Sequence, residues 1–195
     1  MTRSVILASG SPRRCKLLKK IVPRFRVVAS GIEEESFRSR NPVTFAVRAA
    51  AAKAEAVGEG YPSSLVIAAD TIVCLGDEIF GKPKNLADAR AMLRKLSGKK
   101  HKVITAVVLT QKSLKRMLTG HEVSWVTFKK LSRATIDEYL KENDCLDKAG
   151  SYAIQESGDA LVDKLEGDYD NVVGLPVQLV RSLLNDWAGA ERPSE

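Results

Sequence analysis

The segment Leu65–Leu75, LVIAADTIVCL, is a nearly continuous apolar run of β-forming residues that contains one charged residue, Asp70. An ionised carboxylate in a buried strand is costly unless it is paired, hydrogen-bonded or bound to a metal. We therefore expect a strand that brings Asp70 to a bulge or a strand end, where its side chain would point into a cleft. The alternative is a structural Asp that accepts backbone N–H groups at a bulge.

Strand-like and helix-like segments alternate along the rest of the chain. Further strands are expected near residues 5–8, 25–29, 78–80, 103–110, 122–128 and 161–165. Helices are expected after Ser11, at residues 42–57, between Asn85 and Gly98, from Ser132 to Leu140, and after Pro176. This mixture predicts a three-layer α/β protein, and the succession of strands near the end predicts a mixed sheet.

The length of 195 residues suits one domain, which we place at residues 1–187 and follow with a frayed tail at 188–195. No apolar run approaches the roughly 20 residues that a membrane span needs, so no membrane partner is expected. The apolar part of the N-terminal segment is too short for a secretory signal, and we expect a cytoplasmic protein.

The cysteines and histidines exclude several kinds of site. Three cysteines at wide spacings form no CxxC pair, so neither a zinc site nor a disulfide framework is indicated. The two histidines, His101 and His121, lie in no metal-ligand pattern, and we expect both at the surface. A His-based metal site or a Ser-His-Asp triad is therefore not expected.

The net charge of +7 is unevenly distributed. Residues 13–26 contain seven Lys or Arg and no acid, whereas residues 156–170 contain six acids and one Lys. The basic region invites a polyanion, either a nucleic acid or a phosphate-rich small molecule. The acidic stretch and the lack of a basic tail or an RNA-binding aromatic pattern argue against a nucleic-acid partner.

The segment ASGSPRR, at residues 8–14, has the features of an anion site. Ser11 is a favoured N-cap and Pro12 stands at the first helical position, so a helix starts directly after a short strand and a tight turn. The N–H groups of a helix start, together with the guanidinium groups of Arg13 and Arg14, favour phosphate. The alternative is a solvated basic first turn.

Four further positions carry weaker local signals. Lys82 in a GKP loop could contact phosphate as a point charge, and Lys53, among alanines of an expected helix, could reach a cleft over a packed stem. The acids at residues 33–35 could hold a divalent ion beside phosphates. Gln155 has the donor and the acceptor that reading a base edge requires. Taken singly, each is also compatible with an ordinary solvated side chain.

The order and spacing of six motifs closely resemble the Maf family of nucleoside triphosphate pyrophosphatases: ASGSPRR, AADTIV, GKP, LSGKKHKVITAV, LDKAGSYAIQ and DYDNVVGLP. The resemblance runs from about Val5 to Trp187. It implies a fold like that of inosine triphosphate pyrophosphatases, with a long mixed sheet, helices on both sides and a nucleotide cleft between two lobes. It also implies hydrolysis of a nucleoside triphosphate to the monophosphate and pyrophosphate, with a divalent metal cation, Mg²⁺ or Mn²⁺.

The resemblance assigns roles to individual positions. The subgroup that acts on dTTP and UTP carries specificity residues that match Arg13, Thr71 and Gln155 here. Asp70 falls on the catalytic proton acceptor and Glu34 on the acidic position near the metal and the water, so both carboxylates would hold the cation. The phosphate-binding positions match Ser9, Arg14, Lys53 and Lys82.

The implied function is a house-cleaning enzyme of the nucleotide pool, with modified pyrimidine nucleotides as further substrates to consider. A different class of function is a nucleotide- or nucleic-acid-binding regulator linked to cell division and septum formation, which the basic N-terminal helix motivates. Glu34 and Asp70 speak against the regulator, because acids in an anion cleft are unfavourable without a metal. The oligomeric state stays open, with a homodimer common among related enzymes.

Overall fold

The computed structural model describes residues 4–32, 39, 41–156 and 158–190. Within these residues the sheet has seven strands in the order β2-β1-β3-β5-β6-β7, with β4 pairing to β3. The strands are β1 (Val5–Leu7), β2 (Arg26–Val27), β3 (Leu65–Leu75), β4 (Glu78–Phe80), β5 (Lys100–Gln111), β6 (Arg116–Phe128) and β7 (Val162–Glu166). Because β1 runs parallel to β2 and β3 while the other pairs are antiparallel, the predicted mixed sheet is confirmed.

The described helices are α1 (Pro12–Lys19), α2 (Pro42–Gly60), α3 (Leu86–Leu96), α4 (Arg133–Glu142), α5 (Gly158–Leu161), α6 (Tyr169–Val173) and α7 (Val177–Gly189), with short 3-10 turns η2 (Lys112–Leu114) and η3 (Ala149–Ser151). Most of the helices begin after a residue whose side chain caps them, whereas α7 follows Pro176 without a side-chain cap. Each of four expected N-caps accepts the N–H of the third residue after it: Ser11, Asn41, Asn85 and Ser132. Each cap satisfies one N–H that the helix itself leaves unpaired.

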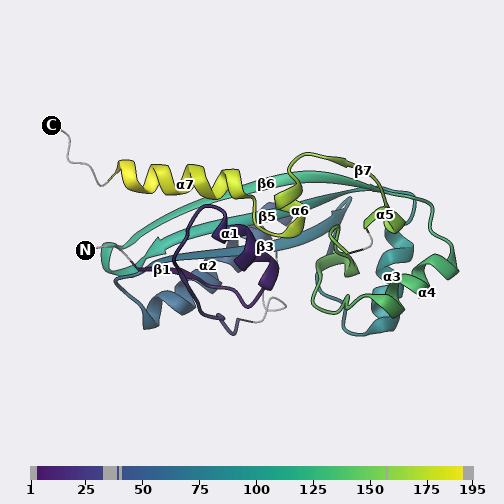
Figure 1. Ribbon diagram of the computed structural model, residues 1–195, viewed down its shortest axis with the longest axis horizontal. Coiled ribbons are helices and arrows are strands. Elements are labelled where there is room, and N and C mark those ends of the chain that lie inside the picture. Colours follow the sequence, from purple (N-terminus) through teal and green to yellow (C-terminus); the bar gives the residue numbers. More distant parts are fainter. Residues whose placement is uncertain (1–3, 33–38, 40, 157, 191–195) are drawn as a thin grey trace.

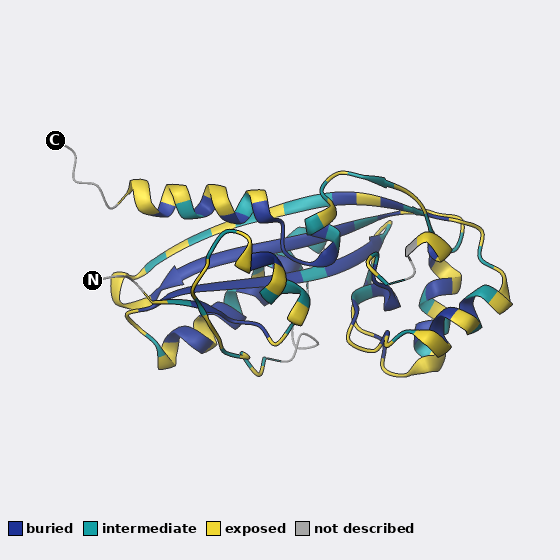
Figure 2. Ribbon diagram, viewed as in Figure 1, coloured by how far each residue is buried: buried dark blue, intermediate teal, exposed yellow. Residues whose placement is uncertain are grey.

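Helices cover both faces of the sheet (Figure 1). On one face, α1 and α7 pack against Leu7 and Ile67. On the other face, α2 packs its alanines against Ile6 and Val66. Successive side chains of a strand point to opposite faces, so the apolar runs of β1 and β3 supply both layers of the core. The central strands are accordingly buried (Figure 2), and the predicted three-layer architecture is confirmed.

The long strands β3, β5 and β6 join two ends of the molecule (Figure 1). Helices α1, α2 and α7 lie toward one end, and α3, α4, α5 and η3 lie at the other. The second end has its own apolar core, which includes Phe80, Leu93, Phe128 and Ile136. This division gives the two lobes that the sequence resemblance implies.

Several details differ from the sequence expectations. Strand β6 begins at Arg116, because the hairpin through η2 continues the β5–β6 pairing as far as Gln111. Helix α7 continues to Gly189, two residues beyond the expected boundary at Trp187. The surface location expected for His101 is wrong: it is 1% exposed, because its ring packs against the rings of Phe128 and Tyr152. None of the described helices combines the length and the apolar character that crossing a bilayer requires.

Candidate active site

A cleft of about 360 Å³ lies beside β3, where residues from both ends of the sheet meet. Strand β1 pairs with residues 65–67 of β3 and β4 pairs with residues 73–75, so the cleft adjoins the stretch between these two pairings. The chain leaves β1 into the ASGSPRR segment and leaves β4 into the GKP loop, and both segments contribute to the cleft wall. The topology thereby brings together two motifs that are far apart in the sequence.

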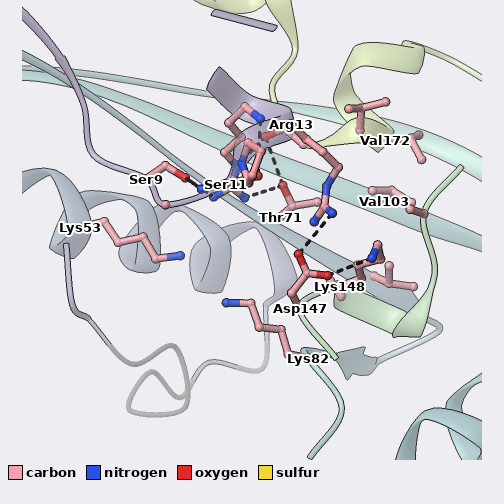
Figure 3. A pocket seen from close by; sticks show the side chains of 18 of the residues that line it. Ser9, Ser11, Arg13, Lys53, Thr71, Lys82, Val103, Asp147, Lys148 and Val172 are labelled. Atoms are coloured by element: carbon pink, nitrogen blue, oxygen red, sulfur yellow. Dashed lines mark hydrogen bonds and ion pairs between the residues drawn. The ribbon is translucent and has the colours of Figure 1, made fainter. Parts of the chain in front are cut away.

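Seven of the predicted site residues line this cleft: Ser9, Arg13, Arg14, Lys53, Thr71, Lys82 and Gln155. Figure 3 labels five of them, namely Ser9, Arg13, Lys53, Thr71 and Lys82. The ammonium groups of Lys53 and Lys82 point into the same space. Asp70 joins the group through its contact with Lys53. Glu34, the other predicted carboxylate, lies outside the described residues. The structure therefore gathers every described candidate at one place, while their individual roles stay predictions.

Asp70 lies in the middle of β3, so the expected bulge or strand end is wrong. Its pairing with Ala106 belongs to an unbroken antiparallel register between β3 and β5. The carboxylate is 1% exposed, and its Oδ1 lies 2.5 Å from Nζ of Lys53 in α2. Lys53 is buried among the small side chains of α2, which let the helix approach the sheet closely. Lys53 is the charged partner that the buried carboxylate needs. The cleft lies beside the part of β3 that neither β1 nor β4 covers.

Arg14 ties three elements together on the other face of β3. Its Nε donates to the carbonyl of Gly174 at 2.9 Å, and its Nη2 donates to Oγ1 of Thr71 at 3.0 Å. The Thr71 hydroxyl lies 2.9 Å from that of Thr105, which donates to the carbonyl of Asn171. Arg14 thus links the start of α1 to β3 and to the turn after α6. The sequence patterns miss this positioning role, because its partners are 57 and 160 residues away in the chain.

A chain of ion pairs starts at Arg13 in α1 and continues on the opposite wall of the cleft. Arg13 Nη1 lies 3.3 Å from Oδ2 of Asp147, and Lys148 Nζ lies 3.0 Å from Oδ1 of the same carboxylate. Lys148 also lies 3.0 Å from Oε2 of Glu156. Burial raises the pKa of Asp147, but its hydrogen bond to Lys148 and the charge of Arg13 outweigh burial and hold this pKa below its ordinary value. The sequence patterns do not single out Asp147 and Lys148, although both lie within the motif LDKAGSYAIQ.

Beside Asp147 and Lys148, part of the wall on the α3–α4 side consists of uncharged side chains, among them Val103, Tyr152 and Val172. The Tyr152 hydroxyl lies 2.8 Å from Nε2 of His101, and its ring meets Phe128 edge-on at 4.8 Å between centroids. Burial raises the pKa of Tyr152 and lowers that of His101 to about 4, so both groups are neutral at neutral pH. Uncharged side chains in one part of the cleft, with the ammonium groups of Lys53 and Lys82 in another, suit a ligand with an aromatic ring and an anionic tail.

The described residues could hold a divalent cation only together with a bound ligand that supplies further oxygen atoms. No group of three or more His, Cys, Asp or Glu side chains among them could hold a metal. Asp70 offers a carboxylate, the hard oxygen ligand that Mg²⁺ prefers. Protein sites commonly hold this ion through one or two carboxylates, waters and substrate phosphates, and a single carboxylate beside cationic phosphate-binding candidates matches that pattern.

The sheet and the whole cleft lie within one family match. Residues 4–187 match the family model described as Maf-like protein. The chain belongs to the Maf family. This Maf protein is 42% identical over 186 residues to a dTTP/UTP pyrophosphatase of Dictyoglomus thermophilum, covering 95% of this chain and 96% of the relative. It is 45% identical over 185 residues to a protein of the same name in Akkermansia muciniphila, covering 95% and 97%.

Solved structures support the fold of this Maf protein independently of close sequence similarity. The Ham1 protein of Staphylococcus aureus superposes with a TM-score of 0.56 at 14% identity, covering 95% of this chain and 100% of that one. A HAM1 protein of Coxiella burnetii gives a TM-score of 0.52 at 13% identity with the same coverage. At such identities the likeness concerns the architecture alone.

Proposed function

We propose that this Maf protein hydrolyses dTTP and UTP to the nucleoside monophosphates and pyrophosphate, as a house-cleaning enzyme of the nucleotide pool. The observation that carries the proposal is the cleft, where Lys53 and Lys82 point into one space beside the buried carboxylate of Asp70. The uncharged side chains on the α3–α4 side, which include Val103, Tyr152 and Val172, suit the base. The relatives named dTTP/UTP pyrophosphatase, which align over nearly their whole length, support the same activity.

In the proposed reaction a water molecule attacks the α-phosphorus of the nucleotide. A bond forms between the water oxygen and phosphorus, while the bond to the oxygen bridging the α- and β-phosphates breaks and pyrophosphate leaves with its electrons. Asp70 accepts the proton of the water, since as the ion-pair partner of Lys53 it is in the charge state that can do so. Lys53 and Lys82 stabilise negative charge that develops on the phosphates.

We also propose that a divalent cation, Mg²⁺ or Mn²⁺, binds together with the triphosphate. Asp70 would hold it, with Glu34 as a second ligand from outside the described residues. When bound, such a cation supplies acidification of the attacking water and neutralisation of the leaving pyrophosphate. A homodimeric state and a cytoplasmic location stay predictions from the sequence.

The direct test is to incubate the purified protein with Mg²⁺ and each of dTTP, UTP, dCTP, dATP and dGTP. Pyrophosphate, orthophosphate and the nucleotide products are then quantified separately. We expect pyrophosphate and monophosphate in equal amounts from dTTP and UTP. Release of orthophosphate and a nucleoside diphosphate would instead place cleavage at the γ-phosphate. No product from any triphosphate, with the protein folded and a nucleotide bound, would exclude the proposed activity.

The alternative, a regulator that binds nucleic acid, is not favoured by the comparisons. The arginines that motivate it, Arg13 and Arg14, line the cleft and contact Asp147, Thr71 and Gly174. They are therefore engaged within a small-molecule-sized space and do not extend as an open basic face along a duplex.

A further inference from the structure

Arg13 reaches across the cleft to a residue of the other lobe. It belongs to α1, whereas its partner Asp147 precedes η3, in the lobe that contains α3 and α4 (Figure 3). The two side chains meet at 3.3 Å, and the Arg13 side chain is 22% exposed. Both residues line the cleft, so the pair lies where a nucleotide would bind.

Asp147 is itself held in place by a buried cation. Its second carboxylate oxygen lies 3.0 Å from Nζ of Lys148, whose side chain is 4% exposed. The Lys148 ammonium also contacts Glu156 and donates to the carbonyl of Asp144. Because one oxygen faces Lys148 and the other faces Arg13, the direction of the carboxylate is fixed from both sides. An isolated surface ion pair has no such restraint.

The same ion pairs extend to a second predicted specificity residue. Glu156 directly follows Gln155, which lines the cleft. The segment carrying Gln155 is thereby connected through Lys148 and Asp147 to Arg13. The charged contacts that start at Arg13 therefore end at Glu156, the chain neighbour of Gln155.

We propose that Asp147 is a positioning residue for nucleotide selection: it fixes the guanidinium of Arg13 in the cleft, and Lys148 anchors it to the Gln155 segment. The inference rests on the proposed function. A guanidinium only donates hydrogen bonds. Held in a fixed direction, it favours thymine and uracil, which carry a carbonyl acceptor where cytosine carries an amino donor. Without Asp147 the guanidinium reorients, and this preference weakens.

The test compares wild type with Asp147→Asn, Arg13→Ala and the double variant. The readout is kcat/KM for dTTP divided by kcat/KM for dCTP. We expect Asp147→Asn to lower this ratio by about tenfold, the effect of misplacing one charge-assisted hydrogen bond. The double variant should lose no more selectivity than Arg13→Ala alone, since Asp147 acts through Arg13. Asp147→Glu, which keeps the charge, should restore part of the ratio.

Asp137→Asn is the matched control. Asp137 pairs with Arg90 at 2.7 Å and with Arg133 at 3.6 Å in the same lobe, and it does not line the cleft. This variant should keep the wild-type ratio. If Asp147→Asn slows dTTP and dCTP equally, or if its effect adds fully to that of Arg13→Ala, the positioning role is overturned.

Binding of non-hydrolysable dUTP and dCTP analogues, measured by calorimetry, separates this inference from the proposed reaction. Loss of binding selectivity in Asp147→Asn supports the positioning role even if the wild-type protein releases no pyrophosphate. Equal binding selectivity in wild type and Asp147→Asn contradicts it even if hydrolysis proceeds as proposed.

Discussion

The carboxylate of Asp70 and the ammonium of Lys53 form an ion pair between β3 and α2, with 2.5 Å between Oδ1 and Nζ. Their side chains are only 1% and 7% exposed. Removing two charges from water is costly, and their attraction and neighbouring hydrogen bonds must offset that cost. Such a pair adds little net stability, and its place beside the cleft is the reason for the role of proton acceptor proposed for Asp70.

Asp70→Asn keeps the shape of the side chain and removes its charge. We expect kcat to fall by roughly 100- to 10,000-fold, the usual contribution of a positioned proton acceptor, while nucleotide binding is retained. The free energy of unfolding should also fall, by up to about 3–5 kcal/mol, because the buried ion pair with Lys53 is broken. Pyrophosphate release, calorimetric nucleotide binding and urea denaturation measure these three effects.

Asp186→Asn, at an exposed position of α7, is the control for loss of a carboxylate and should match wild type. Turnover of Asp70→Asn at a near-normal rate would remove Asp70 from the role of proton acceptor.

Arg14→Lys keeps the positive charge but cannot reproduce the hydrogen bonds to both Gly174 and Thr71. We expect the free energy of unfolding to fall by about 2 kcal/mol, the scale of charge-assisted hydrogen bonds. The kcat/KM values for all triphosphates should fall together, because the start of α1 shifts for every substrate. Arg24→Lys, at an exposed position, is the comparison and should leave both quantities unchanged. Unaltered stability of Arg14→Lys would show that these contacts do not position α1.

His101 makes stability depend on pH. Burial lowers its pKa from 6.5 to about 4 in the folded protein. At pH values between these two pKa values, His101 binds a proton in the unfolded chain but not in the folded protein. The free energy of unfolding is therefore highest above the pKa of the unfolded state, and it falls as the pH is lowered toward the pKa of the folded state. The free energy of unfolding is lowered by roughly 3 kcal/mol in total once the pH is below both pKa values and His101 is protonated in both states.

Urea denaturation of wild type and His101→Phe at pH values of about 7.5 and 4.5 tests this expectation, because the two pH values bracket most of the shift. The variant should lose less stability on acidification than wild type. His121→Phe, which replaces an exposed histidine, should lose as much stability on acidification as wild type. An identical pH dependence in wild type and His101→Phe would contradict the assignment.

Gly150 holds η3 close to β3. Its φ is +69°, and an added Cβ would lie 3.0 Å from Cγ2 of Val73. Its N–H also donates to the carbonyl of Gly81, which connects η3 to the loop that carries Lys82. We expect Gly150→Ala to lower the free energy of unfolding by about 1–3 kcal/mol and to raise KM for dTTP.

Two further variants separate the causes of the Gly150→Ala effect. Gly76→Ala, with φ of +60° and no described residue beyond its chain neighbours within 4 Å of the added Cβ, measures the backbone cost alone and should be milder. In the double variant, Val73→Ala should recover the steric part, so the two effects would be less than additive. Full additivity would show that contact with Val73 is not the cause.

The sequence by itself determines the local elements of this protein and the identity of its family. The N-caps at Ser11, Asn41, Asn85 and Ser132 act within four residues of their own position, so the helix starts can be predicted from adjacent letters. The apolar run of β3 requires burial wherever it lies, which favours a layered α/β fold. The ordered motifs identify the residues that the structure then gathers in the cleft.

Only the tertiary structure decided how these residues work together. The cleft beside Asp70 arises because β1 and β4 cover separate parts of β3, which no local pattern encodes. His101 is buried because the rings of Phe128 and Tyr152, which belong to other segments of the chain, pack against it. Arg13 forms its ion pair with Asp147 only because the two lobes lie opposite each other in the folded protein. Charge pairing and burial depend on distances in space, and residues that are remote in the chain acquire those distances only when the sheet is assembled.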